Sequence, residues 1–126
     1  MKKKQAKQPG VQSWRHIPVP PFRCGICVFI GTPAACVRHL RKMGFPDAID
    51  VADLKARIAE SSAVTICLPY GESCVYSNRD IRHGVLIHEL CHAVGHMLSY
   101  KEIAETPPNN EVFAYTLEYL FEEATK

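Results

Sequence analysis

Apolar and polar positions alternate in blocks along the chain, and the first blocks predict a strand followed by a helix. Residues 22–31, FRCGICVFIG, form a nearly continuous apolar run, which is typical of a strand covered on both faces. Thr32 followed by Pro33 is a helix-start signal, and the apolar–polar pattern AACVRHLRKM then stops at Gly44, a preferred helix end. The proline-rich stretch over residues 11–21 indicates an extended lead-in.

The middle of the chain predicts a short helix and a hairpin. Asp50, with Asp53 three positions later, is a capping pattern for a helix that ends near residue 60. AVTICLP, residues 63–69, is rich in β-branched residues and ends in proline, as strands do. After a turn-like stretch, CVYS over residues 74–77 predicts a strand that returns beside it.

Two further helices are expected before the C-terminus. Ser77 and Asp80 form a capping box, which predicts a helix over about residues 78–100. The sequence Thr-Pro-Pro at 106–108 breaks the chain, and Asn109 or Asn110 caps a last helix, EVFAYTLEYLFEEA. The predicted fold class is α+β, with a short sheet of two to four strands packed on helices.

Composition bounds the class of protein. The chain has 126 residues, 47% of them hydrophobic, so one domain with a core is expected, which we place at residues 14–126. Residues 1–13 predict a disordered basic tail. Four lysines and no acid stand in the first ten residues, so the formal charge of the remainder is 2 − 4 = −2. Because these remaining residues show no basic cluster, no specific nucleic-acid partner is expected.

Membrane and secretory signals are also missing from the pattern. No apolar run approaches the roughly eighteen residues that span a bilayer, so no membrane partner is expected. The basic start MKKKQAK lacks the apolar stretch of a signal peptide, which predicts a cytoplasmic protein. The six cysteines are then expected as free thiols.

The stretch HELCHAVGH, residues 88–96, carries the candidate chemistry. On a helix, positions i and i+4 share a face, so His88 and His92 project side by side toward one metal ion. Glu89 points part-way round the helix, where a carboxylate reaches a metal-bound water. This is the H-E-x-x-H pattern of zinc hydrolases, and Zn²⁺ is the expected cofactor.

Three alternative zinc-ligand patterns are weaker. His96 continues the face, but the line from His88 to His96 is about 12 Å long, too long for one ion. Gly95 fits the metzincin spacing, whereas Leu98 stands where that branch needs a histidine. Cys24 and Cys27 lie inside a predicted strand without a second pair, which favours core packing over a zinc knuckle.

HELCH, followed by a loop and NEVFAY, resembles the gluzincin branch of zinc metallopeptidases. The whole layout also resembles small H-E-x-x-H proteins of bacteriophages and prophages, with a closing E-x-x-A-Y helix. The resemblance implies a zincin-like domain that holds zinc through His88, His92 and Glu111, with Glu89 as general base. Thermolysin-like members have an aspartate four residues after the third ligand. Tyr115 stands there, which implies a hydroxyl that supports a ligand or faces the substrate.

Two functions of different class follow from these residues. The first is a zinc-dependent hydrolase that cleaves a peptide or protein substrate, with Glu89 and Tyr115 as catalytic residues. An extended peptide is expected to add to a sheet edge, at CVYS. The second is a zinc-stabilised, non-catalytic accessory module of a phage that binds a host protein. The oligomeric state, including a homodimer that completes the site, stays open.

Overall fold

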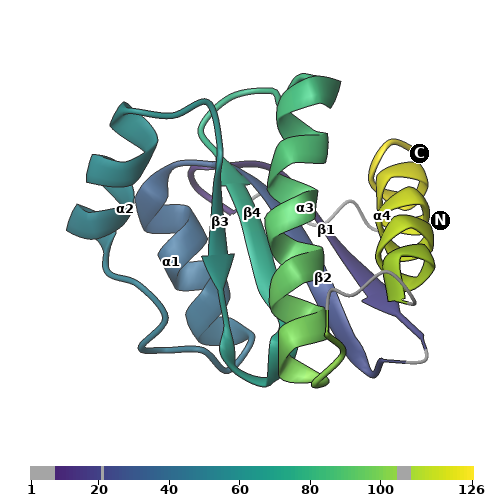
Figure 1. The fold of residues 1–126 in the computed structure, drawn as a ribbon. Helices are drawn as coiled ribbons and strands as arrows, with labels where there is room; N and C mark the ends of the chain where they lie inside the picture. The colour runs from purple at the N-terminus through teal and green to yellow at the C-terminus, as the bar shows by residue number, and fades with distance from the viewer. Residues whose placement is uncertain (1–7, 21, 105–108) are drawn as a thin grey trace, which may run out of the picture.

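The computed structural model of the protein describes residues 8–20, 22–104 and 109–126. Nine elements follow one another along the chain (Figure 1). They are β1 (Val11–Val19), β2 (Cys24–Gly31), α1 (Pro33–Lys42), α2 (Val51–Ala59), β3 (Val64–Cys67), the single 3-10 turn η1 (Pro69–Gly71), β4 (Ser73–Ser77), α3 (His83–Tyr100) and α4 (Asn110–Ala124).

The four strands form one mixed sheet in the order β1-β2-β4-β3. β1 is antiparallel to β2, β2 is parallel to β4, and β4 is antiparallel to β3. The predicted hairpin of residues 63–69 and 74–77 is therefore confirmed as β3 and β4. The short strand β3 forms one edge of the sheet, and β4 lies in its interior.

Helices cover both faces of this sheet, as Figure 1 shows. One apolar core joins the sheet to α1 and α2, and a second joins the opposite face to α3 and α4. The α+β class and the four-strand upper limit of the predicted sheet are confirmed.

The two cores explain the continuous apolar run of β2. Successive side chains of a strand point to opposite faces. Cys27 and Phe29 therefore enter the core under α1 and α2, whereas Cys24 and Ile26 enter the core under α3 and α4. Cys24 and Cys27 are three positions apart and face different cores, so one metal ion cannot bind both. All six cysteines are free.

Two predicted helix caps are present. The Thr32 hydroxyl oxygen accepts a hydrogen bond of 3.2 Å from the Ala35 amide at the start of α1. The Asp50 carboxylate accepts one of 2.7 Å from the Asp53 amide at the start of α2. Within the described ranges, no helix has the length and apolar character needed to cross a membrane.

The expected start of α3 is wrong by five residues. The Ser77 hydroxyl donates to the Ser62 carbonyl oxygen at 2.8 Å, and the Asp80 carboxylate accepts a hydrogen bond of 2.6 Å from the Gln12 side chain. The Ser77 oxygen also accepts a hydrogen bond of 3.3 Å from the Arg79 amide, but neither Ser77 nor Asp80 caps α3, whose N-cap residue is Arg82. The helix begins only at His83.

Two expectations at the sheet edges also need correction. Residues 11–13 belong to β1 and pair with β2, so they are not part of a disordered tail. Residues 1–7 and the expected break at 106–108 lie outside the described residues. CVYS cannot receive an added peptide strand, because β4 is already paired with β2 on one side and β3 on the other.

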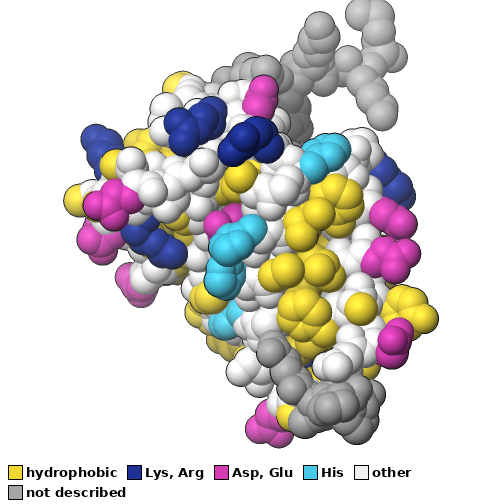
Figure 2. Space-filling view, turned by 45° about the horizontal axis from the view of Figure 1, so that its top comes forward, with side chains coloured by type: hydrophobic (Ala, Val, Ile, Leu, Met, Phe, Trp, Pro, Cys, Tyr) yellow, Lys and Arg dark blue, Asp and Glu magenta, His cyan; other side chains and the backbone are white. Residues whose placement is uncertain are grey.

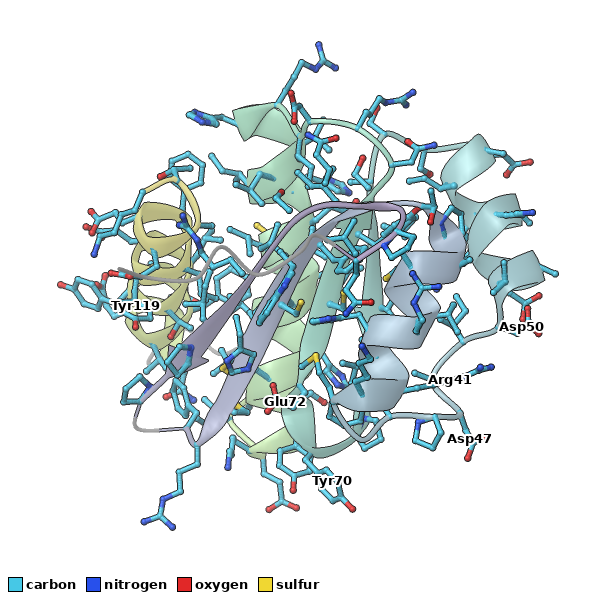
Figure 3. All side chains as sticks on the ribbon, turned by 180° about the vertical axis from the view of Figure 1, so that it is seen from behind. Arg41, Asp47, Asp50, Tyr70, Glu72 and Tyr119 are labelled. Carbon is cyan, nitrogen blue, oxygen red and sulfur yellow. The ribbon has the colours of Figure 1, made fainter. Side chains whose placement is uncertain are left out.

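A carboxylate ties the turn before β4 to the start of β2. Glu72, labelled at the base of the sheet in Figure 3, accepts a hydrogen bond of 2.7 Å from the Gly25 amide. The turn itself is tight, with left-handed backbone at Tyr70 (φ 65°) and Gly71 (φ 78°). η1 therefore reverses the chain between β3 and β4 within a few residues.

A buried hydroxyl gives a stability test of the sheet. The Tyr76 side chain is fully buried, and its hydroxyl donates to the Gly31 carbonyl oxygen at 2.8 Å. Burial raises the pKa of Tyr76 to about 12. Tyr76→Phe leaves that carbonyl without its partner, so we expect unfolding in urea to cost about 1–2 kcal/mol less.

Tyr119→Phe is the matched control. The Tyr119 hydroxyl, on the exposed side of α4 in Figure 3, donates to the Pro18 carbonyl oxygen at 3.0 Å. Water replaces this partner, so a change of less than about 0.5 kcal/mol is expected. If both variants lose the same free energy of unfolding, the buried Tyr76 bond stabilises the fold no more than the exposed one.

Candidate functional site

The two histidines of the H-E-x-x-H pattern lie together on the outer face of α3. Leu86, Leu90 and Val94 face the core, so His88 and His92 are left exposed one turn apart. Their Nε2 atoms are 3.2 Å apart, and the ring planes meet at 78°. The structure thus brings the first two predicted ligands together.

This separation fits two ligands of one ion. Two nitrogens bound to tetrahedral zinc at about 2.0–2.1 Å lie about 3.3–3.4 Å apart. Two bare nitrogen lone pairs at 3.2 Å repel each other, so either a proton or a cation must lie between His88 and His92. The pair therefore meets the geometric test for half of a zinc site.

Glu89 lies on the side of α3 that faces β3. The residue is only 8% exposed, and its Oε2 accepts a hydrogen bond of 2.5 Å from the Thr65 hydroxyl. The same hydroxyl oxygen lies 3.0 Å from the Glu89 backbone carbonyl. Because a buried carboxylate is costly without a partner, this contact fixes both the side chain and the turn of α3 against β3.

Two adjoining hollows meet at Glu89. The first has a volume of about 420 Å³, and its lining includes Arg57, Cys67, Glu89 and His92. The second, of about 360 Å³, is lined in part by Gly84, His88 and Glu89. Figure 2 shows histidine side chains gathered on this face, with basic groups on one side and an apolar surface on the other. The site is an open groove beside the edge strand.

Glu111, the predicted third ligand, is exposed in the first turn of α4. The two helices run antiparallel, since Phe121 contacts His83 at the start of α3 while Phe113 and Leu98 share a hollow near its end. Glu111 therefore lies level with the last turns of α3. Within residues 8–20, 22–104 and 109–126, no three His, Cys, Asp or Glu side chains gather closely enough to hold a metal.

Tyr115 lies one turn beyond Glu111 and is 66% exposed. It lines neither of the two hollows at Glu89. The structure thus joins His88, Glu89 and His92, and it leaves Glu111 and Tyr115 on the neighbouring helix. The roles of these last two residues stay predictions.

His96 has a different partner from the other histidines. Its ring Nε2 lies 2.8 Å from the Leu68 carbonyl oxygen, to which an N–H at that position donates. The bond ties the end of α3 to the chain just before η1. His96 therefore helps to hold α3, which carries His88 and His92, in place.

A second group of titratable side chains is buried under α1. The Cys27 sulfur lies 3.7 Å from His39 Nε2. A hydrogen bond from the Cys74 thiol, assisted by His39, lowers the pKa of Cys27 to about 6 in spite of its burial. The pKa of Cys74 is raised, because its thiol is hydrogen-bonded to Cys27 and Cys36 and because it is buried. This group lies in the other core from α3 and takes no part in the groove.

No protein-family model, curated protein or solved structure matches the chain. The function must therefore be inferred from the groove itself. Two of its residues, Thr65 and Arg57, have no signature in the sequence, because only the packing of β3 and α2 brings them to Glu89.

Thr65 provides a test of the groove. Thr65→Val keeps the shape of the side chain but removes the donor to the buried Glu89 carboxylate. We expect the free energy of unfolding at pH 7 to fall by about 1–3 kcal/mol. Thr65→Ser keeps the donor and should lose much less. Urea denaturation of the three chains measures this, and equal stability of the Val and Ser variants would show that the contact does not form.

Proposed function

We propose that the chain is a small zinc-dependent peptidase with a zincin-like arrangement of the gluzincin type. His88 and His92 would hold the ion, and Glu111 is proposed as the third ligand. The observation that carries the proposal is the exposed pair of Nε2 atoms at 3.2 Å beside the buried Glu89 carboxylate. When bound, zinc lowers the pKa of a water toward neutrality and polarises a carbonyl.

Glu89 would move the proton. Thr65 occupies Oε2, so Oε1 is the oxygen left to accept a proton from the attacking water. The same carboxyl would then deliver that proton to the leaving amine. A structural zinc site needs no such carboxylate, which favours catalysis over a purely structural role. Tyr115 is retained as a proposed catalytic donor on α4.

The groove also suggests how a peptide would bind. Among the described residues, β3 is an edge strand of the sheet, beside the hollow that Glu89 and His92 line. An extended peptide can pair with an open strand edge through main-chain hydrogen bonds. We therefore move the proposed peptide site from β4 to β3. The six free thiols suit a reducing compartment, and we propose the cytoplasm.

Zinc content tests the metal centre. The intact chain should bind one zinc per molecule, and His92→Gln should weaken binding by at least about a hundredfold. His83→Gln is the matched control, since this exposed histidine of α3 contacts Phe121 and not the pair. Competition with a chromophoric chelator measures the affinity. Equal affinities of the two variants, or no zinc in the intact chain, would leave a module that acts by contact alone.

The same assay examines the third ligand separately. Glu111→Gln should weaken zinc binding if α4 supplies its carboxylate, and Glu118→Gln, further along the same helix, should not. An unchanged affinity in Glu111→Gln would remove Glu111 from the site while leaving the histidine pair in place.

Glu89→Gln tests catalysis. The variant should keep zinc, because the carboxylate is not a ligand, and lose at least about a hundredfold in the rate of peptide cleavage. Cleavage of a mixed peptide library, followed by mass spectrometry, measures the rate. A Glu89→Gln protein that cleaves as fast as the parent would exclude Glu89 as the base.

A further inference from the structure

Arg57 enters the groove from the last turn of α2. Its guanidinium donates a hydrogen bond of 3.1 Å to the Thr65 carbonyl oxygen. The hydroxyl of that same Thr65 binds Glu89. A single residue of β3 therefore separates a positive charge from the proposed general base, and Arg57, Glu89 and His92 line one hollow.

The charge of Arg57 is available to a ligand. The side chain is exposed, and within the described part of the chain no ion pair involves it. Glu60 lines the same hollow, but in the described part of the chain it forms no ion pair with Arg57. A guanidinium has five N–H donors in a planar fork that matches a carboxylate, and the bond to the Thr65 carbonyl uses one N–H of Nη2.

We infer that Arg57 is a substrate-binding residue that selects peptides with a carboxylate close to the cleaved bond. The inference rests on the proposed peptidase function. Thr65 contacts both Arg57 and Glu89, so a carboxylate bound at Arg57 lies close to the bond at which Glu89 would act. The carboxylate is the C-terminus of a short peptide or an acidic side chain within a longer one.

Binding to an inactive protein tests this inference. The full chain carrying Glu89→Gln, loaded with zinc, is titrated calorimetrically with a tripeptide free acid, its C-terminal amide, and an amide with aspartate at the last position. At low salt the free acid should bind about three- to tenfold more tightly than the plain amide. The aspartyl amide distinguishes the two sources of the carboxylate. If it binds as tightly as the free acid, the site accepts an acidic side chain.

Variants of α2 assign the preference to a residue. Arg57→Gln should abolish the difference between acid and amide, whereas Lys55→Gln, which removes a charge from the same helix outside the hollow, should keep it. Equal binding of acid and amide to the parent, no binding of either, or a preference that survives Arg57→Gln would each overturn the inference.

The same titrations without zinc separate this inference from the metal proposal. The Arg57-dependent preference for the acid should persist in the zinc-free protein, because the guanidinium makes the contact. A chain that binds no zinc but keeps the preference would reject the peptidase and retain an Arg57 carboxylate site. A chain that binds zinc but shows no preference for the acid would reject the Arg57 carboxylate site and leave the metal proposal standing.

Discussion

The contact between the Thr65 hydroxyl and the Glu89 carboxylate fixes the position of the site on the fold. Glu89 is buried, with 8% of the residue exposed, so its carboxylate needs a hydrogen-bond partner, and β3 supplies one. The contact sets the rotation of α3 about its axis. With Glu89 turned toward β3, His88 and His92 must face outward, and the open edge of the sheet lies beside them.

The same constraint explains why the site is open on one side. α3 and α4 share a core, so α4 covers the flank of α3 away from β3. Among the described residues, the hollow between α3 and β3 is lined from α2, β3 and α3, and Arg57 reaches it from α2. An exposed histidine pair, a buried carboxylate and a basic side chain thus meet where an extended ligand has access.

Much of this fold could be predicted from the sequence, because many of its features depend on residues close together in the chain. The apolar run of β2, the caps at Thr32 and Asp50, and the β3–β4 hairpin depend on neighbours in sequence and were found. The start of α3 was misplaced, because Ser77 and Asp80 bind Ser62 and Gln12, which are distant in sequence. The pairing of β1 and the interior place of β4 likewise depend on contacts across the sheet.

The residues of the site likewise fall into those that local sequence predicts and those that tertiary packing places. Helical spacing alone placed His88 beside His92 and turned Glu89 aside. Thr65 and Arg57 could not be found this way, since tertiary packing brings them to Glu89. Glu111 was expected over the histidines, but the antiparallel packing of α4 places its first turn beside the end of α3.

X-ray absorption by the zinc-loaded chain identifies directly the atoms that bind the ion at the His88–His92 pair. We expect two imidazole nitrogens at about 2.0–2.1 Å from the zinc, with oxygen in the remaining positions and no sulfur. A shell containing sulfur at about 2.3 Å would place the ion on cysteine, and failure to bind zinc would contradict the site altogether.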